Sequence, residues 1–173
     1  MFGRYENYPR DIHNIAFFRH QNQVKSVQQA IFATFHSMND ENFSLCDTLP
    51  YIKQNCILSF EFGVADGYDF VFLDDLELDH CLKIIDENEL QILDFFSIAK
   101  YHLIRKARKV PLRFDYHAFR FIFSEGGLEM QICHEKGIQH IPLDELTNFI
   151  IKQINAELLQ KRLAPLYGWN LIK

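Results

Sequence analysis

The sequence predicts an α+β fold in which an antiparallel sheet carries its helices on one face. The main observation is a repeated pattern: Cys56–Arg108 and Arg113–Arg162 each predict two strands around a Gly turn, followed by a helix. The length of 173 residues fits one domain over residues 1–173, with these segments as an internal ββα pseudo-repeat. A composition of 48% hydrophobic and 24% charged residues is sufficient to form a buried core.

The N-terminal elements are a strand and a helix. After an irregular start, the apolar segment Ile12–Phe18 predicts a strand. Apolar residues then recur at helical spacing, which predicts a helix. These residues are Val24, Val27, Ile31, Phe35 and Met38. A polar loop that contains Pro50 leads to the first hairpin.

The register of the first hairpin depends on the length of its loop. A two-residue Asp-Gly turn places Phe60 and Phe62 on the face opposite the Phe residues of the second strand. A three-residue loop with Gly67 in the left-handed conformation instead pairs Phe62 with Phe70 and Phe60 with Phe72. Because this register forms a single aromatic face, we expect the three-residue loop and a positive φ at Gly67.

An acidic loop separates this hairpin from a second predicted helix. Asp86 can cap that helix, and Glu89 three residues later completes a capping box. Its apolar stripe consists of Ile92, Phe96, Ala99 and Leu103. The helix is expected to end in the basic run 105–109, before Pro111.

The C-terminal half predicts a second hairpin and a third helix. The hairpin spans Arg113–Glu135 and turns at Glu125–Gly127. One face of its two strands carries Phe119, Phe121, Phe123, Leu128, Met130 and Ile132. A short segment, Ile138–Ile141, can add to the sheet. The helix Leu143–Arg162 is expected to bury Leu146, Phe149, Ile150, Ile154 and Leu158, and the tail holds the only Trp, Trp169.

The predicted order of elements is β-α-β-β-α-β-β-α. Its first six elements match the ferredoxin-like order, and the alternative grouping is two strand-strand-helix halves, 56–108 and 113–162. Either arrangement leaves one face of the sheet without helices. That face is expected to carry Glu61, Asp69, Val71, Leu73, Arg120, Ile122, Glu129 and Gln131. Such a mixed face, in a chain with 17 Phe, favours contact with a partner such as a second copy.

The strongest candidate site lies in the second hairpin. The register that aligns its Phe residues places His117 nearly opposite His134, with Asp115 in phase on the same strand. Two imidazoles and a carboxylate can perform acid–base chemistry, and with Glu135 and His140 they are candidate metal ligands. The spacing matches no metal signature. The alternative is that His117 and His134 end the apolar face and form hydrogen bonds within the core.

Two charged clusters are further candidates. An acidic run can collect a divalent cation, although it lacks the Gly and the terminal Glu of a calcium loop; it comprises Asp74, Asp75, Glu77 and Asp79, followed by His80 and Cys81. A solvated loop before a helix explains the same residues. A basic cluster at the end of the second helix can bind phosphates or complement the helix dipole. It comprises Arg105, Lys106, Arg108, Lys109 and Arg113.

Several classes of function are disfavoured. The net charge of −5 opposes general attraction to nucleic acid, and the chain has no P-loop, G-x-G-x-x-G or G-x-S-x-G motif. Cys133 and His134 are adjacent in a strand, so their side chains point to opposite faces and do not form a dyad. Met1–Arg19 has no signal-peptide core, and no apolar run reaches the ~18 residues of a membrane span. Four scattered cysteines without a CxxC motif predict reduced thiols in a cytoplasmic protein.

These observations favour a non-catalytic protein that acts through protein–protein contact. It is expected to be an interaction module or assembly subunit, most simply a homodimer, with no cofactor. The first alternative is a small metal- or His-dependent enzyme centred on His117, His134 and Asp115. The second is a nucleic-acid-binding protein that uses the basic end of the second helix.

Overall fold

The computed structural model describes residues 1–48 and 55–168 and confirms an α+β fold with an antiparallel sheet. In chain order the elements are β1 (Asn14–Arg19), α1 (Val24–Met38), β2 (Phe43–Ser44), α2 (Leu45–Thr48), β3 (Cys56–Asp66), β4 (Asp69–Phe72), α3 (Asp75–Glu87), β5 (Ile92–Arg105), β6 (Arg108–Ser124), β7 (Gly127–Lys136), α4 (Leu143–Gln160) and β8 (Tyr167–Gly168).

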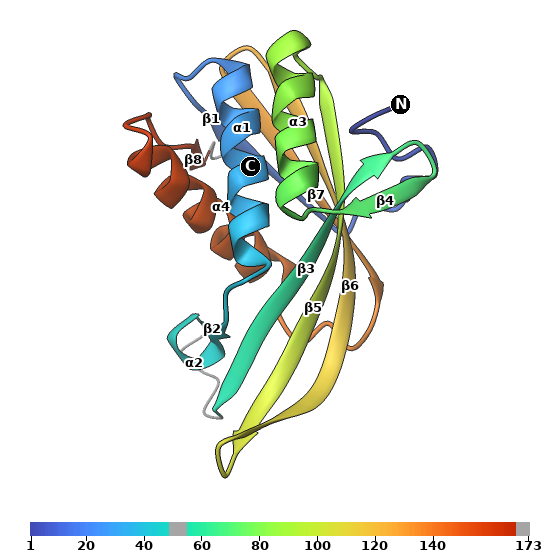
Figure 1. Cartoon of the computed structure of the whole chain (residues 1–173), viewed down its shortest axis with the longest axis vertical. Helices are drawn as coiled ribbons and strands as arrows, with labels where there is room; N and C mark the ends of the chain where they lie inside the picture. Colours follow the sequence, from blue (N-terminus) through green and yellow to red (C-terminus); the bar gives the residue numbers. More distant parts are fainter. Residues whose placement is uncertain (49–54, 169–173) are drawn as a thin grey trace, which may run out of the picture.

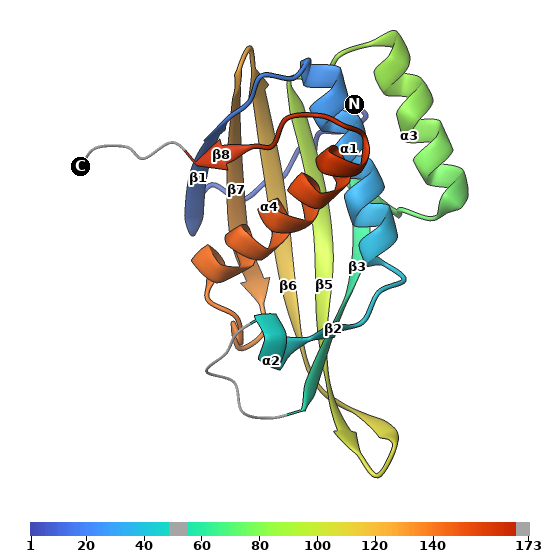
Figure 2. The same cartoon turned by 90° about the vertical axis from the view of Figure 1, so that its left-hand side faces the viewer.

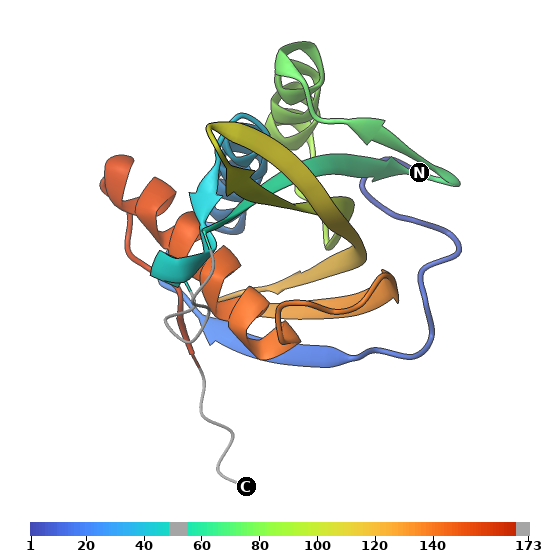
Figure 3. The same cartoon turned by 90° about the horizontal axis from the view of Figure 1, so that it is seen from below.

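In the described part of the chain, eight strands form a single curved sheet. The strand order is β2-β3-β5-β6-β7-β1-β8, with β4 paired to β3 outside this path. Helices α1, α3 and α4 cover one face, which we call the inner face (Figures 1 and 2). The N-terminal segment, residues 1–13, passes over the opposite, outer face (Figure 3). The predicted placement of helices on one side of an antiparallel sheet is therefore confirmed.

Phenylalanine side chains fill the space between the helices and the inner face. Phe35 of α1 stacks on Phe62 of β3 with ring centroids 4.1 Å apart, and it meets Phe95 of β5 edge-on at 4.8 Å. Aromatic pairs in these geometries add stability beyond their buried area. The predicted apolar stripe of α1 is buried from Val27 to Met38, so the spacing identified this helix and its packing face.

The first hairpin has a different register from the predicted one. Its loop has two residues, Gly67 and Tyr68, because Asp66 pairs with Asp69. Gly67 has the expected positive φ of +70°, but Phe70 pairs with Ala65 instead of Phe62. Phe70 and Phe72 therefore point to the outer face, away from Phe60 and Phe62. The N-terminal segment stabilises Phe70 on the outer face, because the ring centroids of Tyr5 and Phe70 are 4.6 Å apart.

The second predicted helix is wrong, because β5 occupies most of its length. Odd-numbered residues of β5 are buried in alternation, which is the period of a strand; they are Leu93, Phe95, Ser97, Ala99 and Tyr101. β3 and β6 flank β5 and provide hydrogen-bonded neighbours on both sides. The acidic run instead forms the start of α3, where the Asp74 carboxylate accepts a hydrogen bond from the Glu77 N–H at 2.8 Å.

The basic run predicted as a helix end is the turn between β5 and β6. Arg105 pairs with Arg108, and the two loop residues Lys106 and Ala107 have φ of +49° and +59°. Positive φ at both central residues is the pattern of a type I′ hairpin turn. The helix-dipole explanation for these cations therefore does not apply.

The second hairpin and the third helix follow the predictions closely. Phe123 pairs with Leu128, Phe121 with Met130 and Phe119 with Ile132, all on the inner face. Helix α4 buries each residue of its predicted stripe. The segment Ile138–Ile141, predicted as a possible strand, is a loop. Trp169 lies outside the described residues.

These differences change the predicted order of elements. The acidic run lies at the start of α3, which precedes β5, whereas the prediction placed the helix after this run, over the segment that forms β5. The ferredoxin-like core is not confirmed. On the expected outer face, Arg120 pairs with Gln131 and Ile122 with Glu129. Leu73 does not lie there, because its side chain is fully buried in the core.

Candidate functional site

The second hairpin brings the predicted histidine pair together. His117 of β6 pairs with His134 of β7, and their ring centroids are 5.4 Å apart. The carboxylate of Asp115 lies on the same face, with its Oδ1 atom 3.0 Å from Nε2 of His134. The cross-strand register was sufficient to predict this cluster, because the Phe pairs beside it fix which residues face each other.

The carboxylate of Asp115 binds the loop that precedes α4. Besides His134, it accepts hydrogen bonds from the Tyr101 hydroxyl at 2.8 Å and from the N–H groups of Gln139 and His140 at 2.8 and 3.0 Å. Burial opposes ionisation, but the four hydrogen bonds outweigh it and lower the pKa of Asp115 below its ordinary value. Gly137 permits this close approach, because a Cβ atom there would clash with the Asp115 carboxylate.

Two members of the cluster are buried, whereas His134 is partly exposed. His117 is 1% exposed and Asp115 is 0% exposed. A pocket of about 350 Å³ lies beyond the loop and is lined by Tyr101, Arg113, Ile138 and His140, but by neither histidine of the pair. A carboxylate-bound imidazole can act as a base. The four hydrogen bonds of Asp115 connect Tyr101, His134 and the loop before α4 to β6.

His117 has an unusual environment for a polar side chain. Neither ring nitrogen has a hydrogen-bond partner among the described residues, and the same holds for the hydroxyl of Ser97, which pairs with His117 across β5 and β6. Burial lowers the pKa of His117 to about 4. His117 is therefore neutral at pH 7, and its polar atoms are a cost to the folded state.

The other predicted metal ligands do not converge. Glu135 lies on the outer face, where it lines a groove with Phe96 and Ala118. The ring of His140 packs on Tyr101 at 4.8 Å, away from the histidine pair. Within residues 1–48 and 55–168, no group of three or more His, Cys, Asp or Glu side chains is arranged to hold a metal ion.

The predicted nucleic-acid residues lie at the end of the β5–β6 hairpin. Lys106, Arg108 and Arg113 have exposed side chains. The side chains of Arg105 and Lys109 are outside the described part of the structure. Figure 1 shows that this hairpin reaches the lower end of the long axis of the molecule, whereas α3 lies at the upper end.

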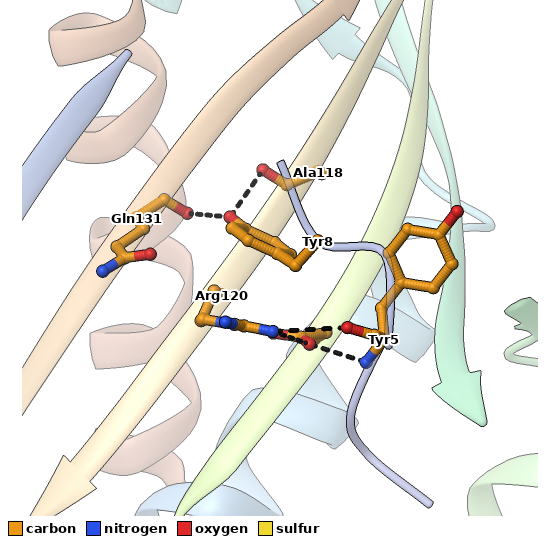
Figure 4. Close-up of polar contacts among 6 residues, drawn as sticks. Tyr5, Tyr8, Ala118, Arg120 and Gln131 are labelled. Carbon is orange, nitrogen blue, oxygen red and sulfur yellow. Dashed lines mark hydrogen bonds and ion pairs between the residues drawn. The ribbon is translucent and has the colours of Figure 1, made fainter. Parts of the chain in front are cut away.

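The outer face carries a polar network that the sequence did not indicate. Asp94 is fully buried and accepts two hydrogen bonds of 2.7 Å from the guanidinium of Arg120 and one of 2.7 Å from the Tyr5 N–H (Figure 4). The guanidinium lies 4.0 Å from the centre of the Tyr8 ring. Asp94 falls within the predicted second helix, so its pairing with Arg120 was not expected. The alternation of side chains along β5 places Asp94 on the same face of the sheet as Arg120.

This network fixes the N-terminal segment above a groove. The groove has a volume of about 530 Å³ and is lined by Tyr5, Asn7, Pro9, Phe70, Phe96, Ala118 and Glu135. Ring centroids are 4.6 Å apart for Tyr5 and Phe70 and 5.4 Å apart for Phe70 and Phe96. The groove thus combines aromatic walls with one carboxylate.

Comparisons with family models, with curated proteins and with solved structures find no match for this chain. Among the helices of the described residues, none is both long enough and apolar enough to cross a membrane. All four cysteines are free thiols.

Proposed function

We propose that this protein is a non-catalytic assembly subunit that associates with a second copy of itself. The observation that carries the proposal is the separation of charge along the chain. The basic hairpin, residues 104–113, contains five Lys and Arg and no acidic residue. The remaining residues carry 13 basic against 23 acidic side chains, a net charge of −10. Opposite charges on the two ends of one chain favour association between copies.

The acidic end is the surface formed by β4 and α3. Residues 66–89 contain nine Asp and Glu and a single Lys, and we call this segment the acidic surface. It also exposes large apolar side chains, namely Tyr68, Phe72 and Leu76. The basic hairpin likewise exposes Ile104, and Phe114 is exposed directly after it. Each end therefore offers apolar area together with a charge of opposite sign, the combination found in specific interfaces.

The geometry favours contact between two molecules over contact within one. The hairpin tip and α3 lie at opposite ends of the long axis, so they do not reach each other in a single chain (Figure 1). An antiparallel two-fold arrangement places each hairpin on the acidic surface of the other copy. Such an interface is isologous and closes as a dimer.

The histidine cluster supports a non-catalytic role. Asp115 accepts four hydrogen bonds from within the protein, and His117 is buried. An acid–base enzyme needs its reacting group within hydrogen-bond distance of a substrate. Among the described residues, the charged surfaces therefore support the proposed function more strongly than the histidine cluster supports an enzyme.

Analytical ultracentrifugation at micromolar concentration tests the proposal. The wild type is expected to sediment as a dimer, with twice the 20.5 kDa mass of one chain, and to dissociate as salt rises. The Lys106→Glu/Arg108→Glu variant reverses two exposed cations of the hairpin and is expected to weaken the dimer at least about tenfold. Lys152→Glu/Arg162→Glu changes the net charge equally at exposed positions in and after α4, and it should leave the dimer intact.

Two results would contradict self-association. The first is a wild type that remains a monomer at low salt and micromolar concentration. The second is equal dimer strength in the hairpin variant and its control. A two-stranded basic ribbon also fits a DNA groove, so a labelled duplex is titrated in parallel. Duplex binding by a monomeric wild type, lost in the hairpin variant, would replace the proposal with a nucleic-acid-binding function.

A further inference from the structure

The groove on the outer face has the chemical features of a site for a small ligand. Its volume of about 530 Å³ falls within the range of small-molecule pockets. The N-terminal segment contributes Tyr5, Asn7 and Pro9 to its lining. A volume of this size suits a small molecule better than a continuous polypeptide.

The walls of the groove favour a positively charged ligand. Tyr5, Phe70 and Phe96 form a series of neighbouring rings, and the faces of such rings attract cations. Glu135 provides the only carboxylate among the lining residues, and no ion-pair partner for it is found among the described residues. The nearby guanidinium of Arg120 is matched by Asp94, so it adds little net positive charge that would repel a cation.

The groove is also held in shape before any ligand arrives. The Tyr5 N–H is fixed by the buried Asp94 carboxylate at 2.7 Å, and the Glu6 N–H donates to the carbonyl of Gly67 at 2.8 Å. The Gly3 N–H donates to the carbonyl of Ala65 at 2.8 Å. Walls that are already ordered lose little conformational entropy on binding, which raises affinity.

We infer that this groove binds a free organic ammonium ion with a short alkyl arm. The ammonium group meets the Glu135 carboxylate and the aromatic faces, while the methylene groups contact Phe70 and Phe96. This site uses no residue of the basic hairpin and shares only Phe70 with the acidic surface, so changes at Glu135 and Phe96 test it separately from the proposed self-association.

Titration of the full chain with butylammonium, followed by NMR shifts of the amides of Tyr5, Phe70 and Phe96, tests the inference. Saturable binding in the millimolar range is expected, while the neutral analogue butanol should bind at least about tenfold more weakly. Glu135→Gln should lower the affinity for butylammonium about tenfold. Phe96→Leu keeps an apolar wall but removes the ring face, so it should lower the affinity several-fold.

Controls separate a site from a general effect of charge or stability. Glu125→Gln removes an equivalent carboxylate in the β6–β7 turn and should leave butylammonium binding unchanged. Thermal melts of each variant verify that the fold is retained. The inference is overturned by absence of saturable binding, by equal binding of butanol, or by unchanged affinity in Glu135→Gln. Sedimentation of the same variants reports self-association separately.

Discussion

Two buried polar residues of the histidine cluster have opposite effects on stability. Asp115 is saturated: four donors surround one carboxylate, and they join β5, β6, β7 and the loop before α4. His117 has no hydrogen-bond partner among the described residues. A satisfied buried carboxylate specifies how elements meet, whereas an unsatisfied imidazole costs free energy. The same cluster therefore contains a residue that organises the fold and one that weakens it.

His117 makes stability depend on pH in a defined window. Its pKa in the folded protein is about 4, below the ordinary 6.5, so the unfolded chain binds more protons between these values. The free energy of unfolding should therefore fall as pH decreases from 6.5 to 4, by about 3 kcal/mol for this residue. His117→Phe should keep stability at pH 7 and reduce the loss at pH 4. Denaturant unfolding at both pH values measures the difference.

The pH experiment distinguishes His117 from other acid-sensitive groups. The pKa of Asp115 is lowered, so its stabilising contribution is lost at more acidic pH, below its ordinary 3.8. His80→Gln changes an exposed histidine of α3 and should leave the wild-type loss in place. An unchanged loss in His117→Phe would contradict the assignment. Zinc binding that disappears in both His117→Ala and His134→Ala would instead support a metal site.

At the scale of elements, the turns decide which faces the side chains occupy. Gly67 has a φ of +70°, and its N–H and carbonyl both bond to the N-terminal segment. Gly67→Val is expected to destabilise the protein by about 1–2 kcal/mol, because a β-branched residue is strained in this conformation. Gly168→Val is the matched control: nothing lies within 4 Å of its added Cβ, so its effect should be within about 0.5 kcal/mol. Equal unfolding midpoints for the two variants would contradict this account.

The β6–β7 hairpin was predicted correctly because its strands are neighbours in the chain, and β1 was predicted from its apolar residues although its partner β7 lies far away in the chain. The β6–β7 pairing follows from a two-residue turn and matched apolar residues, so the positions of His117 and His134 followed too. The segment of β5 has residues at both helical and strand spacing, and its strand neighbours β3 and β6 settle the choice. The pair of Asp94 and Arg120 was not predicted, because a helix over this segment does not align Asp94 with Arg120. The bond from the Tyr5 N–H, 89 residues from Asp94, has no local signal in the sequence.

At the scale of the molecule, the fold separates the charges that the sequence places in two segments. The β5–β6 hairpin carries its cations to one end, and the β3–β4 hairpin with α3 carries the carboxylates to the other (Figure 1). The outer-face groove lies on the sheet between them, with its aromatic residues drawn from the N-terminal segment, β4 and β5. One curved sheet thus presents two charged surfaces and a groove that shares Phe70 with the acidic one, and the two charged surfaces complement each other only between copies.

Charge reversal at both ends gives the most specific test of this complementarity. The Lys106→Glu/Arg108→Glu variant places acidic residues on both contact surfaces, and Asp69→Lys/Asp79→Lys reverses two exposed carboxylates of the acidic surface. Each variant alone should dimerise more weakly than the wild type, because its reversed residues face charges of the same sign. In a mixture, both hairpin contacts join opposite charges, so a heterodimer should form. Sedimentation of the mixture should give twice the 20.5 kDa chain mass, because a two-fold interface closes. Growth beyond that mass would indicate an open head-to-tail assembly, and a mixture that stays monomeric would show that these surfaces do not meet.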